Sequence, residues 1–136
     1  MPHLTSTEIA GRIEDLYGAP IADLEAHAQD QVPGMLAALL GMHHGLALAE
    51  RGIAVHRDLL AQLVRPERQI DRHEVSHLLD GARRLAEAVA VREAQAKSLS
   101  AVLQSLARVT TPAPSPVPAP SAPASPVPAG SPARCH

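Results

Sequence analysis

The sequence predicts an all-α fold: a long antiparallel helical hairpin, preceded by short N-terminal helices and followed by a disordered tail rich in Pro, Ala and Ser. Apolar residues recur at helical spacing along two long segments that are joined by a short polar connection. The apolar residues are almost all aliphatic, with one Tyr and no Phe or Trp, which favours helix packing over a β-sheet. Nine of the 13 prolines lie in the last 26 residues.

Three segments follow from these patterns: short helices over 1–31, the helical hairpin over 32–110, and a disordered tail over 111–136. The first segment has one basic and six acidic residues, whereas the hairpin has ten basic and eight acidic residues. The whole chain has a net charge of −2. No overall basic charge attracts nucleic acid, so we expect no nucleic-acid partner.

Helix boundaries in the N-terminal segment can be predicted from its capping residues. Thr5 and Glu8 have the spacing of a capping box, in which each side chain bonds the backbone N–H of the other residue. Gly18 is suited to ending this helix, and Pro20 to the first turn of a second short helix. Pro33 likewise fits the first turn of the long helix that follows.

Two apolar seams with alternating spacings of three and four residues define the hairpin. The first seam contains Met35, Leu39, Met42, Leu46, Ala49, Ile53, His56, Leu60 and Leu63. The second contains Val75, Leu78, Ala82, Leu85, Val89, Arg92, Ala96, Leu99, Leu103 and Leu106.

A connection of five or six residues around Pro66 separates the seams, and a second capping box, Asp71 with Glu74, begins the second helix. Folding the seams together about residue 69 places Arg92 one turn from Glu50, which makes an ion pair between them one of two expectations. The other is that the Arg92 side chain extends to solvent.

Further apolar residues lie off both seams, more than the short N-terminal helices can cover, so we expect the chain to form a homo-oligomer. The candidate interface consists of eight aliphatic seam residues: Leu39, Leu46, Ile53, Leu60, Leu78, Leu85, Leu99 and Leu103.

The segment His73-Glu74-Val75-Ser76-His77 matches the pattern H-E-x-x-H. Over these five residues it resembles the zincin metallopeptidases, which implies zinc ligands at His73 and His77 and a catalytic base at Glu74. However, the motif lies in the first turn after a predicted N-cap, no strands are predicted beside it, and Glu74 already has a capping role.

The sequence favours a non-enzymatic helical assembly or protein–protein interaction module that needs no cofactor, with the tail as a tether to an unidentified protein partner. Two alternatives stay open: a zinc-dependent hydrolase that uses residues 73–77, and an amphipathic coat on a hydrophobic or membrane surface. The sequence contains no convincing transmembrane segment or N-terminal signal, so we expect a cytoplasmic protein. Cys135 is the single cysteine, so no intrachain disulfide can form.

Overall fold

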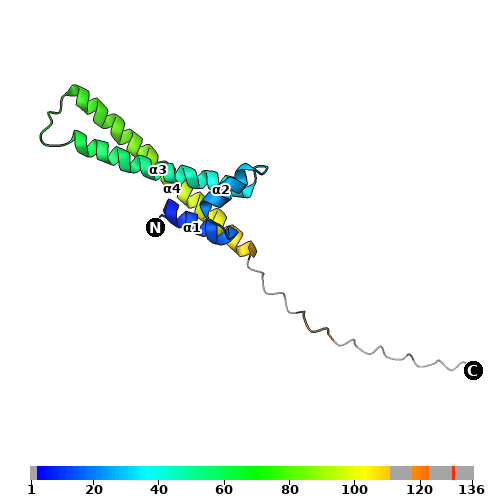
Figure 1. Ribbon diagram of the computed structural model, residues 1–136. Helices are drawn as coiled ribbons and strands as arrows, with labels where there is room; N and C mark the ends of the chain where they lie inside the picture. Colours follow the sequence, from blue (N-terminus) through cyan, green and yellow to red (C-terminus); the bar gives the residue numbers. More distant parts are fainter. Residues whose placement is uncertain (1–2, 111–117, 123–129, 131–136) are drawn as a thin grey trace, which may run out of the picture.

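The computed structural model describes residues 3–110, 118–122 and 130, and these residues contain four helices and no strand. The helices are α1 (Ser6–Tyr17), α2 (Ile21–Gln29), α3 (Met35–Leu63) and α4 (Arg72–Thr110) (Figure 1). The predicted all-α class is therefore confirmed. Most of the predicted disordered tail, including Cys135, lies outside the described residues, whereas 118–122 and 130 belong to no helix.

Helices α3 and α4 form the predicted hairpin, and they make the most extensive contact between any two elements of the fold. Small residues let the two helices approach each other closely. A Cβ atom on Gly81 would lie 3.0 Å from Cδ2 of Leu60, and one on Gly52 would lie 3.7 Å from the Cβ of Ala88. The two helices are thus in close contact at both of these levels.

The hydrophobic core lies at one end of this hairpin. Helices α1 and α2 pack there against the first part of α3 and the last part of α4 (Figure 1). The core consists of ten buried residues: Ile9, Ile13, Leu24, Leu39, Leu40, Leu46, Ala49, Ala96, Leu99 and Leu103. We call this end of the molecule the body, and residues 50–95, which extend beyond it, the distal hairpin.

The N-terminal capping box is confirmed. The Thr5 N–H donates to Glu8 Oε2 at 2.7 Å, and the Glu8 N–H donates to Thr5 Oγ1 at 3.3 Å. Gly18 ends α1 with φ of 71°, in the left-handed region that favours glycine. Pro20 lies one residue earlier than predicted, at the N-cap of α2 with extended backbone. The placement of Pro33 in the first turn of α3 is wrong, because Gly34 is extended and α3 begins at Met35.

The connection between α3 and α4 spans residues 64–71 and is longer than predicted. Helix α3 ends at Leu63, three residues before Pro66. Proline cannot donate a backbone hydrogen bond, and its ring disfavours helical backbone at the preceding residue, Arg65. The helix therefore stops early, and the extra residues lie in the connection.

Candidate functional site

The distal hairpin has no buried side chain. None of residues 50–95, all of which the structure describes, is buried, whereas the body contains every buried hydrophobic residue. Two helices cover only one face of each other, so their facing side chains keep open edges unless further helices are added. The distal hairpin is consequently the part of the described chain that is least complete as a packed unit.

The eight predicted interface residues fall into two groups. Leu39, Leu46, Leu99 and Leu103 are buried in the body, where α1 and α2 cover the hairpin, so they serve the core of a single chain. The other four lie in the distal hairpin and are only half-buried: Ile53, Leu60, Leu78 and Leu85.

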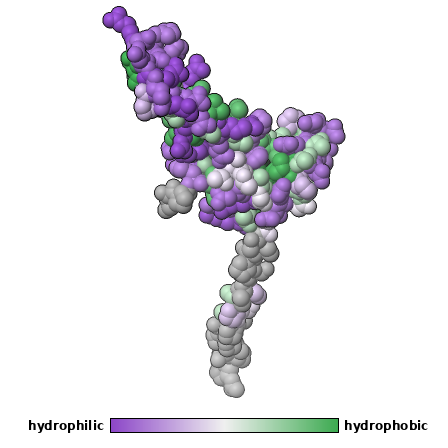
Figure 2. Space-filling view, turned by 60° about the vertical axis from the view of Figure 1, so that its left-hand side comes forward, coloured by the Kyte–Doolittle hydropathy of each residue, from purple (hydrophilic) through white to green (hydrophobic). Residues whose placement is uncertain are grey.

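A second apolar stripe runs along α3 outside the seam. Leu48, Val55 and Leu59 are 58%, 54% and 48% exposed. Their separations of seven and four residues place them on one face of the helix. On α4, Val75 and Leu79 are 44% and 66% exposed. Figure 2 shows apolar side chains among the hydrophilic ones along the distal hairpin.

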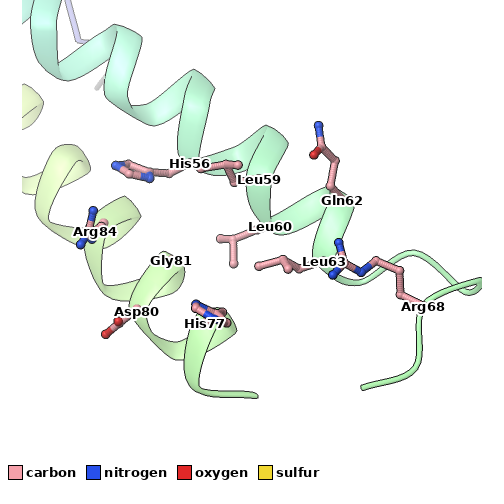
Figure 3. Close-up of a pocket in the computed structure, with 10 residues that line it drawn as sticks. All are labelled: His56, Leu59, Leu60, Gln62, Leu63, Arg68, His77, Asp80, Gly81 and Arg84. Atoms are coloured by element: carbon pink, nitrogen blue, oxygen red, sulfur yellow. The ribbon is translucent and has the colours of Figure 1, made fainter. Parts of the chain in front are cut away.

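A groove of about 510 Å³ lies between α3 and α4 near the connection (Figure 3). Leu60 and Leu63 of α3 point toward α4 and give the groove an apolar interior. Its polar lining includes His56, His77 and Arg84. The groove therefore combines aliphatic surface with imidazole and guanidinium groups.

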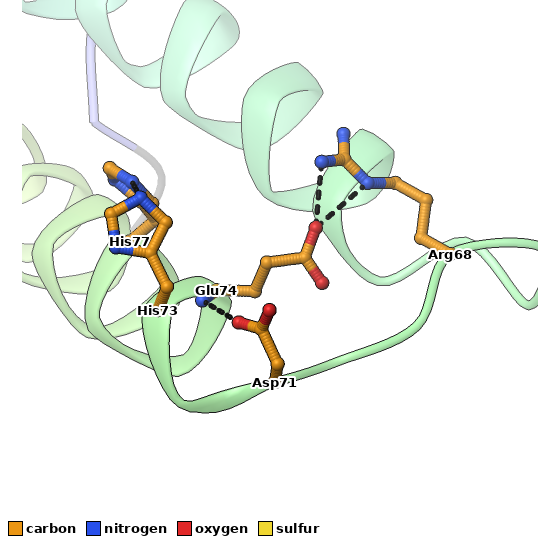
Figure 4. A network of polar contacts seen from close by, with 5 residues as sticks. All are labelled: Arg68, Asp71, His73, Glu74 and His77. Carbon is orange, nitrogen blue, oxygen red and sulfur yellow. Dashed lines mark hydrogen bonds and ion pairs between the residues drawn. The ribbon is translucent and has the colours of Figure 1, made fainter.

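The H-E-x-x-H segment begins α4, and its polar contacts divide into two sets (Figure 4). Asp71 Oδ1 accepts the Glu74 N–H at 2.9 Å, which confirms Asp71 as the capping residue. Glu74 Oε1 accepts from Arg68 Nη2 at 2.7 Å and from Nε at 3.2 Å. His73 and His77 form the other set, with their Nε2 atoms 3.1 Å apart.

The second capping box is therefore only half formed. The predicted return bond from Glu74 to the Asp71 backbone is replaced by the contact with Arg68. The other oxygen, Glu74 Oε2, is buried and has no hydrogen-bond partner among the described residues. A guanidinium that donates two charge-assisted hydrogen bonds competes effectively with a single backbone N–H for the Glu74 carboxylate.

This arrangement gives the hydrolase alternative no geometric support. Figure 4 shows the Glu74 carboxylate directed toward Arg68 and away from the two imidazoles. A catalytic zinc site uses three protein ligands and a base close to the bound water. Among the described residues, no three His, Cys, Asp or Glu side chains are grouped to hold a metal ion. Within the described part of the chain, the histidine pair thus offers two ligands and no third.

At the N-terminus of α1 and at the N-terminus of α4, hydrogen bonds lower the pKa of one carboxyl group. Hydrogen bonds from the Thr5 backbone and side chain lower the pKa of Glu8. The backbone N–H of Glu74 lowers the pKa of Asp71, with smaller contributions from His73. Both carboxylates are exposed, and their charged forms complement the positive end of the helix dipole.

A polar network joins α1 to α3 where the distal hairpin leaves the body, and the sequence did not reveal it. Glu50 Oε1 accepts the Ser6 N–H at 2.8 Å, and Glu50 Oε2 accepts the Ser6 hydroxyl. His43 Nε2 lies 3.1 Å from the Ser6 carbonyl oxygen. Of the two expectations for Arg92, the pair with Glu50 is not formed, because Arg92 Nη2 lies 3.7 Å from Glu93 Oε1. The sequence held one indication of this contact: the N–H groups in the first turn of α1 have no acceptor within the helix, so they require an acceptor elsewhere.

Comparisons of the chain with protein families, with curated proteins and with solved structures found no match. Among the described residues, no helix is long and apolar enough to cross a membrane.

Proposed function

We propose that this protein is a non-enzymatic helical assembly module and that its distal hairpin associates with a second copy of the chain. The observation that carries this proposal is the exposed stripe that begins at Leu48, at the edge of the body, and continues through Val55 and Leu59 of the distal hairpin. Aliphatic side chains at helical spacing on one face are the pattern of a packed helix, yet no element of the described chain covers this face.

A second copy supplies the missing layer in the simplest way. Two distal hairpins packed face to face form a four-helix bundle, in which each helix has two neighbours instead of one. A two-fold arrangement buries the same stripe on both copies. The half-buried seam residues Ile53, Leu60, Leu78 and Leu85 would then lie inside the bundle.

The size of the surface sets the expected strength of association. In the distal hairpin, α3 extends to Leu63 and α4 begins at Arg72. Helices of these lengths present a face on the order of 600 Å² per copy. Specific interfaces bury roughly 800 Å² per partner. We therefore expect a dimer whose population depends on protein concentration.

The test compares the oligomeric mass of paired variants by light scattering and native mass spectrometry. Val55→Gln with Leu59→Gln removes the stripe at two positions, where the side chains are 54% and 48% exposed. The matched control is Val32→Gln with Val109→Gln, since these residues are 89% and 82% exposed but lie outside the distal hairpin.

We expect the wild type and the control to dimerise with rising concentration and the stripe variant to remain monomeric. Its helical circular dichroism should be unchanged, because replacing exposed side chains costs little stability. A wild type that remains monomeric at its highest soluble concentration would overturn the proposal.

The same stripe also supports the second candidate, an amphipathic coat on a hydrophobic surface. In that case the stripe lies against lipid or another apolar surface instead of a second copy. Flotation with lipid vesicles separates the two functions. Binding of a monomeric wild type, lost with Val55→Gln and Leu59→Gln, would favour the coat over the dimer.

A further inference from the structure

The two imidazoles at the start of α4 have the arrangement of a bidentate metal chelate. The Nε2 atoms of His73 and His77 are 3.1 Å apart, whereas the ring centroids are 4.5 Å apart. The rings therefore turn their Nε2 atoms toward each other. Both side chains are exposed, so a dissolved ion can reach the space beside these two nitrogens.

The nitrogen separation fits the bond lengths of a transition metal. An ion placed about 2.0–2.1 Å from each Nε2 atom, as zinc is in proteins, would subtend an angle of roughly 100° between them. This angle lies between the octahedral and tetrahedral values, so the nitrogen separation suits one shared ion once both rings turn to direct their Nε2 lone pairs at it. The helix holds the pair in place, because residues four positions apart share one face.

The contact between the rings is a hydrogen bond in which one Nε2 donates and the other accepts, with the roles set by the tautomer of each ring. We propose that His73 and His77 bind one divalent transition-metal ion per chain. Zinc, nickel, copper or cobalt takes the place of the Nε2 proton, and this proton moves to Nδ1 of the same ring, so that both histidines bind as neutral imidazoles. Imidazole nitrogen suits these ions, whereas magnesium and calcium require oxygen ligands.

The surroundings define what kind of site this is. The Asp71 carboxylate accepts a hydrogen bond from the Glu74 N–H in this turn, and its negative charge offsets the positive end of the helix dipole, which disfavours a cation. No third ligand from the described residues joins the pair. Water or an added ligand therefore completes the coordination, and the site is open and exchangeable.

Isothermal titration calorimetry with zinc chloride and with nickel chloride tests the proposal on the full chain. We expect one ion per chain for the wild type and loss of this binding in His73→Ala and in His77→Ala. His44→Ala is the matched control, since His44 is an exposed helical histidine with Leu40 and Leu48 four residues away. Cys135→Ser controls for binding by the tail.

A second measurement reports where the ion binds. One ion can bind His73 and His77 together only while the turn between them is helical. Bound metal should therefore slow the hydrogen exchange of backbone amides in the first turns of α4 in the wild type. The proposal fails if binding persists in His73→Ala and His77→Ala, or if neither ion binds. Light scattering on the same samples reports dimerisation separately, so failure of this site and failure of the proposed assembly are distinguishable.

Discussion

At the scale of single residues, two similar capping motifs reach different outcomes because of their neighbours. Thr5 and Glu8 bond each other reciprocally, and the charge of Arg12 acts on the Glu8 carboxylate without displacing these bonds. Glu74 has the same spacing from Asp71, yet it bonds Arg68 in the connection. A capping pattern in a sequence therefore predicts the helix start more reliably than it predicts the partner of the second carboxylate.

The lowered pKa of Glu8 predicts a pH-dependent contribution to stability. Because its pKa in the folded state lies below the ordinary value of 4.5, the carboxylate stabilises the fold above that pH. This contribution is lost as pH falls from the ordinary pKa through the lower folded one. Comparing urea unfolding of the wild type and Glu8→Gln from pH 6 to pH 2 should show a difference that narrows as pH falls. A constant difference would contradict the prediction.

At the scale of elements, the glycines of α3 and α4 separate into open and packed positions. A Cβ atom on Gly41 would meet no atom within 4 Å, whereas one on Gly81 would lie 3.0 Å from Leu60 Cδ2. The first glycine weakens its helix without aiding packing, and the second permits the helices to approach.

Alanine substitutions should therefore have unequal effects on the free energy of unfolding. Gly41→Ala should stabilise the protein by about 0.5–1 kcal/mol, because alanine has the higher helix propensity. Gly81→Ala should stabilise the protein by a smaller amount, because Leu60 must move to admit the new methyl group. Denaturant unfolding of the two variants provides the comparison, and a larger gain for Gly81→Ala would refute it.

The sequence predicted the helices well because their determinants are local: caps, apolar spacing and proline positions. It did not predict the division of the hairpin into a filled body and an open distal part. That division depends on where α1 and α2 pack, and identical seam spacing near Leu46 and near Leu60 carries no information about it. The Glu50–Ser6 contact was missed for the same reason, since it joins residues 44 positions apart.

At the scale of the whole molecule, the burial of every core residue at one end predicts unequal local stability. Regions with few buried apolar contacts open with a smaller free energy than the global unfolding free energy. Residues 50–95 lack buried side chains, whereas the body is enclosed by α1 and α2.

Native-state hydrogen exchange should therefore show that amides of the distal hairpin open before those of the body. The measurement is best made on the Val55→Gln and Leu59→Gln variant, because association of the wild type would protect the distal hairpin. Leu46→Ala in this background should destabilise the body by about 2–5 kcal/mol, as expected for a buried leucine. Equal protection along α4 would contradict the division.

One helix, α4, runs through both parts of the molecule without a break and spans 39 residues. At 1.5 Å per residue this is a rod of about 58 Å. Its first two turns carry the histidine pair, and the Pro/Ala/Ser-rich segment of the sequence follows its last residue, Thr110. Because a continuous helix is stiff along its axis, the histidine pair and Thr110 lie near opposite ends of one rod and are separated by most of its length.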